Sequence, residues 1–311
     1  MTDKQRDNLL QQLDNMSSEA RSPDSMDIDL LSSIEIVKRI NAADQTVAHS
    51  VANCLEQVAA VAEHIVTAFA AGGRLVYLGA GTSGRLGILD AVECPPTYSV
   101  PSSQVVALIA GGNGAVYKAV EGAEDNPDLA VDDLKRIDLC KNDILIGIAA
   151  SGRTPYVLGG LAYARSLGCF TAAISCNANA PVLTAADAGI CAVVGPEVVT
   201  GSTRMKAGTA QKLILNMLTT TAMIRSGKVY QNLMVDLHAS NEKLVARAVR
   251  IVIQATDCEP QIARDALKAA DMSAKLAILH ILSGQSIEHC KTQLEQQHGF
   301  IRKVLEQDKP A

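Results

Sequence analysis

The chain has 311 residues, of which 48% are apolar and 20% charged, a mixture typical of a globular protein with a sizeable core and not of a disordered or fibrous chain. A net charge of -5 and an aromatic content of only 3% both disfavour a nucleic-acid partner. No stretch reaches about 18 uninterrupted apolar residues, which argues against a membrane span, and the polar residues 1–20 lack the apolar core of a signal peptide. We therefore expect a cytoplasmic protein with one large domain or two medium ones.

The first part of the chain is predicted to be helical. Ser32 and Glu35 have the spacing of a capping box that opens a short helix. A longer helix is expected over 44–71, where apolar residues recur at helical spacing until Gly72 and Gly73 end it.

Short apolar runs then alternate with helical segments. The predicted strands are 74–80, 105–112, 143–151, 170–175 and 189–194. The predicted helices between them cover 84–93, 115–124, 127–137 and 155 to about 167. Near-continuous apolar strands separated by helices indicate a five-stranded parallel sheet covered on both faces, that is, a three-layer α/β domain with right-handed crossovers.

The remainder is predicted to be helical. A long apolar helix covers 206–225, and the region beyond 240 consists of short amphipathic pieces broken near Asp271, Ser283 and Gly299. We therefore expect a polar and helical N-terminal segment, an α/β domain and a small C-terminal helical bundle, with the bounds 1–43, 44–239 and 240–311.

The eight cysteines contain no CxxC pair, and the histidines contain no HExxH pattern. In a chain without an export signal, these features favour reduced and mostly buried thiols over disulfides or a structural zinc site, so no metal is expected.

Three predicted strands end in loops that combine glycine with hydroxyl and basic residues. The loops are 78–87, 149–155 and 195–209, and their basic residues are Arg85, Arg153, Arg204 and Lys206. The carboxyl ends of parallel strands meet at one edge of a sheet, where helix N-termini offer unpaired N–H groups to anions. Three such loops together predict a bound phosphate ester.

A nucleotide is the first alternative ligand. The GxxxxGK[ST] pattern is absent, whereas GAGTSG (79–84) satisfies GxGxxG after a predicted strand. However, the acidic partner expected about 20 residues later falls in 96–104, which contains no Asp or Glu. A compact phosphate is therefore favoured over a dinucleotide.

Two glutamates are candidate proton-transfer groups. Glu93 precedes Pro95 and Pro96, and Glu124 precedes Pro127, so each is expected near the C-terminal end of a helix. There the helix dipole disfavours ionisation of a carboxyl group, which suits a general acid, although a solvated surface Glu is the alternative for each. A helix of ten residues is about 15 Å long. Glu93 therefore needs a short or bent helix to reach the phosphate, or it must act in the site of a second subunit.

The three loops resemble those of the sugar isomerase (SIS) domain. The stretch GPEVVTGSTRMKAGTAQKL (195–213) is similar to a signature of glucokinase regulatory proteins and bacterial N-acetylmuramic acid 6-phosphate etherases. With LGAGTSGRLGILDAVECPPTY (78–98) and KAVEGAEDN (118–126), the resemblance is to the etherase family and covers the chain from about residue 20. The segment 17–25 departs from the family pattern, because Ser18 and Ser22 stand where Thr and Asn are usual.

The resemblance implies cleavage of the lactyl ether of N-acetylmuramic acid 6-phosphate by water, without a metal or redox cofactor, in recycling of cell-wall murein. It implies Glu93 as the acid that protonates lactate and later activates water, and Glu124 as a second catalytic residue, with Glu121 as its competitor. Which glutamate is acid and which is base stays open. The implied phosphate-binding residues are Thr82, Ser83, Gly84, Ser151, Gly152 and Thr154, with Ser202 and Thr203 as further candidates.

Two other functions share these features. A non-catalytic sugar-phosphate sensor would use the same loops, and an aldose–ketose isomerase would remove the same C2 proton. The short length and the two glutamates favour the etherase over a sensor. Because SIS domains generally pair, we expect a homodimer that binds a small sugar phosphate and neither nucleic acid nor membrane.

Overall fold

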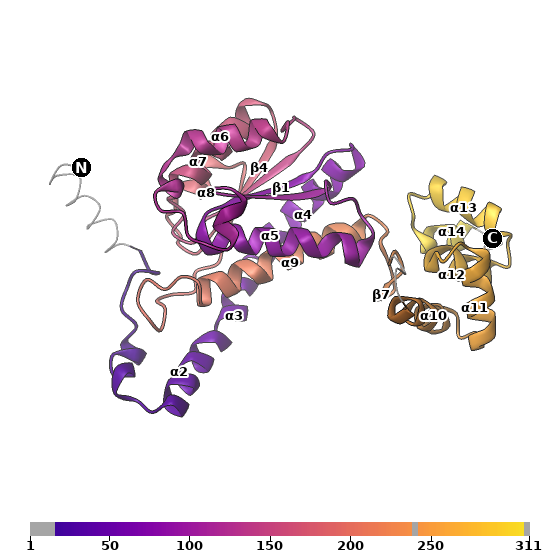
Figure 1. Cartoon of the computed structure of the whole chain (residues 1–311), viewed down its shortest axis with the longest axis horizontal. Coiled ribbons are helices and arrows are strands. Elements are labelled where there is room, and N and C mark those ends of the chain that lie inside the picture. The colour runs from indigo at the N-terminus through magenta and orange to yellow at the C-terminus, as the bar shows by residue number, and fades with distance from the viewer. Residues whose placement is uncertain (1–15, 238–241, 308–311) are drawn as a thin grey trace. The chain divides into compact units, whose positions relative to one another are not determined.

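The computed structural model of the chain describes residues 16–237 and 242–307 (Figure 1). The polar start at 1–15 and the boundary expected between 239 and 240 lie outside these residues. The described residues form two compact units. One comprises the described part of Met1–Ala91 together with Ser103–Leu218, and the other comprises Val92–Ser102 together with the described part of Thr219–Ala311.

The first unit contains the predicted five-stranded parallel sheet. Its strands are β1 (Leu75–Gly79), β2 (Val105–Ile109), β3 (Ile144–Ile148), β4 (Phe170–Ser175) and β5 (Ala188–Cys191). They are ordered β2-β1-β3-β4-β5, and every residue of β1 and β3 is buried. The near-continuous apolar runs are thus explained by burial on both faces, and the predicted α/β class is confirmed.

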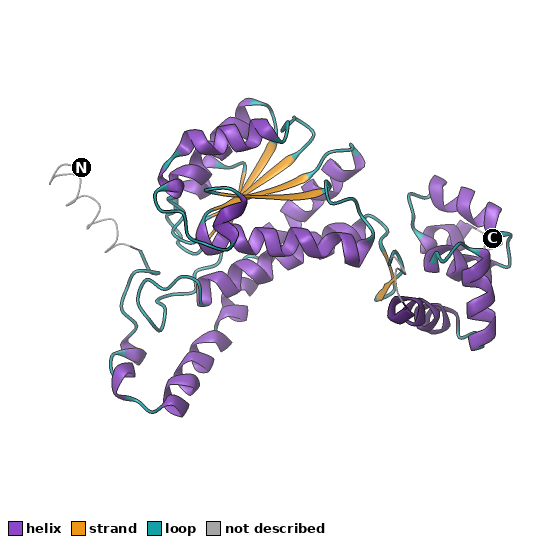
Figure 2. Ribbon diagram, viewed as in Figure 1, coloured by secondary structure: helices purple, strands orange, loops and turns teal. Residues whose placement is uncertain are grey.

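Helices cover both faces of this sheet (Figure 2). Val76 and Leu78 of β1 face a core shared with α6 (Pro127–Arg136) and α7 (Pro155–Ser166). On the opposite face, Tyr77 of β1 donates a hydrogen bond to Asp90 of α5 (Gly81–Tyr98), over 2.9 Å. The chain therefore leaves β1 and β3 toward opposite faces, which creates a topological switch point between their carboxyl ends.

The N-terminal helices differ in part from the expectation. The capping box of Ser32 and Glu35 is confirmed at the start of α2 (Ser33–Gln45). The single helix expected over 44–71 is instead divided into α3 (Val47–Ala52) and α4 (Leu55–Ala70). Cys54, with φ -123° and ψ 17°, departs from helical backbone between them and divides a continuous apolar pattern.

The helix predicted over 115–124 does not form. The chain there forms only two short 3-10 turns, η3 (Asn113–Val116) and η4 (Ala123–Asp125). Gly122 lies between them with φ +75°, a left-handed conformation that glycine adopts readily and that a helix interior excludes. The segment that carries Glu121 and Glu124 is therefore a loop.

The second unit is a small helical bundle with a short hairpin, which confirms the predicted C-terminal helical region. Its helices are α10 (Glu242–Thr256), α11 (Pro260–Ala269), α12 (Ala274–Ser283), α13 (Ile287–Gln296) and α14 (Ile301–Gln307). The hairpin pairs β6 (Val229–Tyr230) with β7 (Leu233–Met234). Buried side chains from these elements, such as Val252, Ile278 and Leu279, form one apolar core.

The eight cysteines are free thiols, and five of them are buried. Burial raises the pKa of the Cys176 thiol to about 12, which keeps this thiol protonated at neutral pH. No helix within 16–237 or 242–307 combines the length and apolar character needed to cross a membrane.

A buried ion pair joins the entrances of the two central strands. The Asp143 carboxylate is 2% exposed and precedes β3, and it accepts hydrogen bonds from Nη2 (2.7 Å), Nε and the backbone N–H of Arg74, which precedes β1. The backbone N–H of Cys140 donates a further bond over 3.0 Å. Burial alone would raise the pKa of Asp143, but the hydrogen bonds from Arg74 and Cys140 outweigh it and hold this pKa below its usual value.

We expect Asp143→Ala to lower the free energy of unfolding by about 3 kcal/mol at neutral pH, because Arg74 and two backbone N–H groups lose a buried partner. Since the folded-state pKa of Asp143 is depressed, its contribution is complete above its unfolded pKa of about 3.9 and is lost as the pH falls through the folded value. Urea unfolding of both proteins should therefore show a gap that narrows below about pH 4. A gap independent of pH would contradict this role of the carboxylate.

Candidate active site

The first glycine loop leads directly from β1 into α5. Thr82, Ser83 and Gly84 lie in the first turn of this helix, where the Gly84 N–H donates a hydrogen bond to the Ala80 carbonyl oxygen over 3.2 Å. A Cβ atom on Gly84 would lie 2.6 Å from a side-chain atom of Ile109 and 2.8 Å from the backbone oxygen of Gly79, so only glycine fits there. This close packing fixes the N-terminus of α5 at the end of β1.

The second loop leads from β3 into α7. Its Ser151 hydroxyl accepts a hydrogen bond from the backbone N–H of Arg153 over 3.3 Å, and Thr154 immediately precedes the helix. Gly152 has φ +69°, and a Cβ atom there would lie 2.2 Å from Cβ of Ala180. Glycine is therefore required at 152 both for the backbone conformation and for the close approach of the neighbouring loop.

These two loops flank the switch point of the sheet. β1 and β3 are neighbours, with Gly79 paired to Ile148, so their loops begin at adjacent positions on the same edge. In open α/β sheets, ligands bind in the crevice outside the carboxyl ends of the strands at such a point. The hydroxyl groups of Ser83 and Ser151 thus belong to the part of the fold where a phosphate is most readily held.

The third loop is predicted to offer unpaired N–H groups at a helix start, and the structure shows that two of these groups are already bonded. The Glu197 carboxylate, 1% exposed, accepts hydrogen bonds from the backbone N–H groups of Lys206 (2.9 Å) and Ala207 (3.0 Å) at the start of α9 (Lys206–Arg225). The chain's own carboxylate therefore occupies the positive end of this helix. A Cβ atom on Gly208 would lie 3.5 Å from the Thr82 methyl group, so the first turns of α9 and α5 are neighbours.

Two of the basic residues of these loops bind backbone oxygens. Arg85 donates hydrogen bonds to the carbonyl oxygens of Ala115 (2.8 Å) and Val116 (2.9 Å), which attach the loop after β2 to α5. The Lys206 ammonium donates to the carbonyl oxygen of Val194 over 2.6 Å. Arg85 and Lys206 therefore stabilise the loops through backbone oxygens.

Glu124 lies near the first loop, but it does not lie at the helix end where the sequence predicts it. It lies in η4, just before the N-terminus of α6, and not at the C-terminal end of a helix, so the dipole argument for it is wrong. It lines a cavity of about 200 Å³ together with backbone and side chains from the ends of β1 and β2. The cavity is lined by Ala80, Gly81, Arg85, Ala110, Ala115, Ala119, Val120, Glu121, Gly122 and Glu124.

Glu93 does not line this cavity, and its predicted position at a helix end is wrong as well. α5 continues to Tyr98 with Pro95 and Pro96 inside it. Glu93 is exposed and lies beyond the middle of this long helix. The route through a short helix is thereby excluded.

Asn177 is a buried polar residue of this edge that the sequence analysis did not single out. Its side-chain amide donates to the Ala150 carbonyl oxygen and to the Ser18 hydroxyl, both over 3.0 Å, and accepts from the Ser17 hydroxyl over 3.1 Å. Asn177 follows β4, so the rule that ligands gather at strand ends would have identified it. It attaches the divergent segment 17–25 to the second loop.

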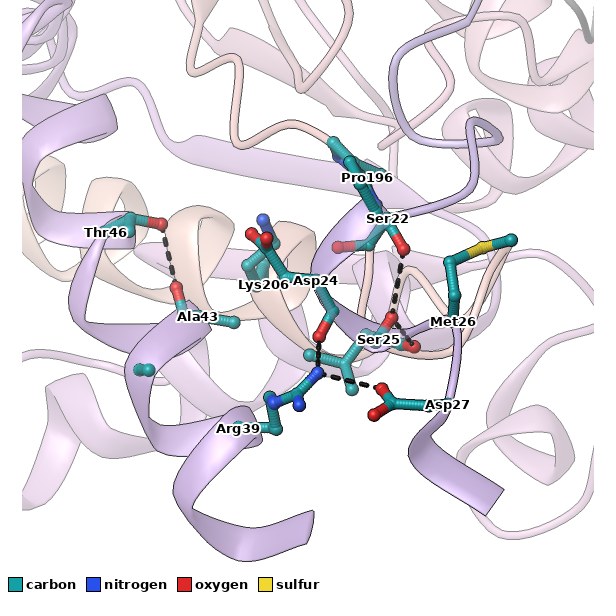
Figure 3. A pocket seen from close by; sticks show the side chains of 13 residues that line it. Ser22, Asp24, Ser25, Met26, Asp27, Arg39, Ala43, Thr46, Pro196 and Lys206 are labelled. Carbon is teal, nitrogen blue, oxygen red and sulfur yellow. Dashed lines mark hydrogen bonds and ion pairs between the residues drawn. The ribbon is translucent and has the colours of Figure 1, made fainter. Parts of the chain in front are cut away.

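Residues 22–25 of that segment border a second cavity, of about 940 Å³ (Figure 3). Ser25 donates a hydrogen bond to the Val198 carbonyl oxygen over 2.8 Å, while the Arg39 guanidinium binds the Asp24 carbonyl oxygen and the Asp27 carboxylate.

Among residues 16–237 and 242–307, no group of three or more His, Cys, Asp or Glu side chains is placed to hold a metal ion.

The fold and the loop chemistry define a domain of the sugar isomerase (SIS) class. A family model of the glucokinase regulatory protein N-terminal SIS domain matches residues 57–165. In a candidate phosphosugar isomerase involved in capsule formation from Bacteroides fragilis, the same fold recurs with a TM-score of 0.50 and 23% identity, covering 65% of this chain and 97% of that one.

Sequence relatives identify the family within this class. The N-acetylmuramic acid 6-phosphate etherase of Vibrio atlanticus is 57% identical over 300 residues, covering 96% of this chain and 98% of the relative. The etherase of Colwellia psychrerythraea is 58% identical over 299 residues, with coverages of 96% and 97%. The chain belongs to the N-acetylmuramic acid 6-phosphate etherase family.

Proposed function

We propose that the chain cleaves the D-lactyl ether of N-acetylmuramic acid 6-phosphate with water, giving N-acetylglucosamine 6-phosphate and D-lactate, as a carbon–oxygen lyase in murein recycling. Near full-length relatives at 57–58% identity carry the name of this activity. The observation that carries the proposal in the structure is the cavity that Glu124 shares with Gly81 and Arg85 of the first glycine loop, at the carboxyl ends of β1 and β2. The expected cytoplasmic location stays a prediction.

The chemistry requires two proton transfers. In the ring-opened sugar the ether at C3 lies β to the C1 aldehyde, so the C2 proton is acidic. A base takes this proton, the C2–H electrons form the C2–C3 double bond, and the C3–O bond breaks while an acid protonates the departing lactate oxygen. Water then adds at C3, with one group taking its proton and the other returning a proton to C2. Two carboxyl groups suffice for the whole cycle.

We assign the base at C2 to Glu124 and the acid at the lactyl oxygen to Glu93. Glu124 shares its cavity with Gly81 of the first loop, as the base must if the 6-phosphate is held there. Glu121 lines the same cavity and stays the competitor for this role. The 6-phosphate is assigned to the two loops at the switch point, through Thr82, Ser83, Gly84, Ser151, Gly152 and Thr154.

We further propose that the active form is a homodimer in which Glu93 serves the partner's site. Glu93 lies beyond the middle of α5, which supports a role outside its own phosphate loop. Size-exclusion chromatography with light scattering should give twice the chain mass of 32.7 kDa for the active sample. An active sample containing only the 32.7 kDa species would contradict the shared site.

A D-lactate assay separates the etherase from its two rivals. Incubation with N-acetylmuramic acid 6-phosphate should release D-lactate and N-acetylglucosamine 6-phosphate in equal amounts. A sensor would bind the sugar phosphate and release nothing, and an aldose–ketose isomerase would change the sugar while leaving its ether intact. Either of those outcomes would refute the proposal.

A further inference from the structure

Gln211 is a buried amide whose nitrogen takes part in no hydrogen bond within the described part of the chain. It lies in the second turn of α9, is 1% exposed, and accepts a hydrogen bond from the Ser83 hydroxyl through Oε1 over 3.0 Å. Its Nε2 atom is buried and has no hydrogen-bond partner within the described part of the chain. Buried side-chain donors in folded proteins are nearly always paired, so this unpaired donor requires an explanation.

The location of the unpaired donor connects it with the first glycine loop. Ser83 is itself only 7% exposed and belongs to the first turn of α5, next to the end of β1. Thr82 approaches Gly208, one turn before Gln211 on α9. Gln211 therefore lies directly behind the hydroxyl group to which the proposed function assigns the sugar phosphate.

The proton of the Ser83 hydroxyl limits what this group can do. A serine hydroxyl has one proton to donate, and in this structure the proton is donated to Oε1 of Gln211. A phosphate dianion offers only acceptors, so Ser83 can bind it only by withdrawing that proton from Gln211. Oε1 would then face a hydroxyl oxygen without a proton between them, which is unfavourable.

Rotation of the amide group removes this conflict. The last torsion of a glutamine side chain is broad and roughly two-fold, so Oε1 and Nε2 can exchange places without a change of backbone. Nε2 then donates to Ser83, and Ser83 donates to the phosphate. Nε2 then has Ser83 as a partner and the Ser83 hydroxyl has the phosphate, whereas Nε2 has no partner in the structure without ligand.

We propose that Gln211 is a positioning residue that delivers the Ser83 proton to the 6-phosphate of the sugar. This inference rests on the assignment of Ser83 to the phosphate under the proposed function. In the free protein Gln211 accepts the Ser83 proton, and with phosphate bound it donates to Ser83. Gln211 thereby couples phosphate binding to completion of a buried hydrogen-bond chain between α9 and α5.

The test compares Gln211→Glu and Gln211→Met with the wild-type chain. A glutamate at 211 accepts the Ser83 proton and cannot return one as a carboxylate, and its charge opposes the phosphate. We expect the dissociation constant for N-acetylglucosamine 6-phosphate, measured by calorimetry, to rise by at least about tenfold, which is the effect of losing one charge-assisted hydrogen bond. Methionine neither accepts nor donates, and its effect should fall between those of glutamine and glutamate.

Two further measurements separate this role from a merely structural one. KM for the phosphorylated substrate should rise more than kcat falls, and thermal unfolding should give a similar Tm for the methionine variant. Asn216 is the matched control, because its amide joins the same two helices through Asp90 over 2.7 Å, farther along α9. Asn216→Ser should leave the dissociation constant for N-acetylglucosamine 6-phosphate unchanged even if it lowers Tm.

The outcomes also distinguish this inference from the proposed function. If Ser83→Ala weakens phosphate binding and the folded Gln211 variants bind as the wild type does, Gln211 has no positioning role and the phosphate assignment stands. If Ser83→Ala itself binds as the wild type does, the assignment of Ser83 to the phosphate fails, and the inference about Gln211 fails with it. If Gln211→Glu does not fold, the methionine variant decides: unchanged binding overturns the inference, and weaker binding at a similar Tm supports it.

Discussion

Replacing Glu93 by alanine is expected to lower kcat for lactate release by at least about 100-fold while the protein keeps its fold, a loss at the low end for positioned acid catalysis. Lactate is a poor leaving group as an alkoxide, so elimination depends on the proton that Glu93 supplies. The side chain is exposed, and its truncation therefore creates no cavity. Steady-state D-lactate assays measure kcat, and circular dichroism checks that the fold is kept. Near-normal lactate release by Glu93→Ala would remove this residue from the mechanism.

The same variant tests where Glu93 acts. If each site uses Glu124 of one subunit and Glu93 of the other, a mixed dimer of Glu93→Ala and Glu124→Gln chains contains one intact site. Mixing the two inactive proteins under conditions of subunit exchange should then restore lactate release. Persistent inactivity after demonstrated exchange would place both glutamates in the site of a single subunit.

Replacing Glu124 by glutamine is expected to lower kcat by about 100-fold to 10,000-fold, because the C2 proton then has no base. The step that fails should be proton removal itself, so exchange of the C2 hydrogen with deuterated water, followed by NMR, should also cease. Glu93→Ala should retain this exchange, since it lacks only the acid that completes the elimination.

Glu121→Gln provides the matched control for Glu124→Gln. The two glutamates line the same cavity and both are exposed, so a general loss of charge in the cavity should affect them alike. We expect Glu121→Gln to retain lactate release and C2 exchange. The reverse result, with Glu121→Gln inactive and Glu124→Gln active, would transfer the role of the base to Glu121.

The sheet could be predicted from sequence because its signal is local. β1 and β3 are buried along their whole length, so their apolar runs stand out against the flanking helices and loops. The glycine loops follow these strands directly, and parallel strands bring them to one edge whatever the details of packing. Local patterns thus sufficed for the α/β class and for the placement of the first two loops.

The settings of the two glutamates could not be predicted in the same way. Pro95 and Pro96 predicted the end of a helix, yet α5 continues through both to Tyr98. Conversely, 115–124 has a helical composition, and Gly122 in a left-handed conformation makes it a loop. In the first segment the helix persists against the local preference of proline, whereas in the second the local preference of glycine ends the apparent helical pattern.

The polar partners behind the loops are a third case. Gln211 meets Ser83 across 128 positions of sequence, and Asn177 meets Ser18 across 159. Neither pairing follows from spacing, because each depends on how separate elements pack together. These pairings can be found only in the structure, whereas the residues at the strand ends can be predicted from the sequence.

The most direct measurement of the central claim is the fate of labelled oxygen during hydrolysis of N-acetylmuramic acid 6-phosphate in ¹⁸O-water. Elimination followed by addition of water breaks the bond between C3 of the sugar and the ether oxygen. Mass spectrometry should therefore find the label on the C3 hydroxyl of N-acetylglucosamine 6-phosphate, while D-lactate keeps the original oxygen. Label in the lactate hydroxyl instead would mean attack at the lactyl carbon and would contradict the mechanism.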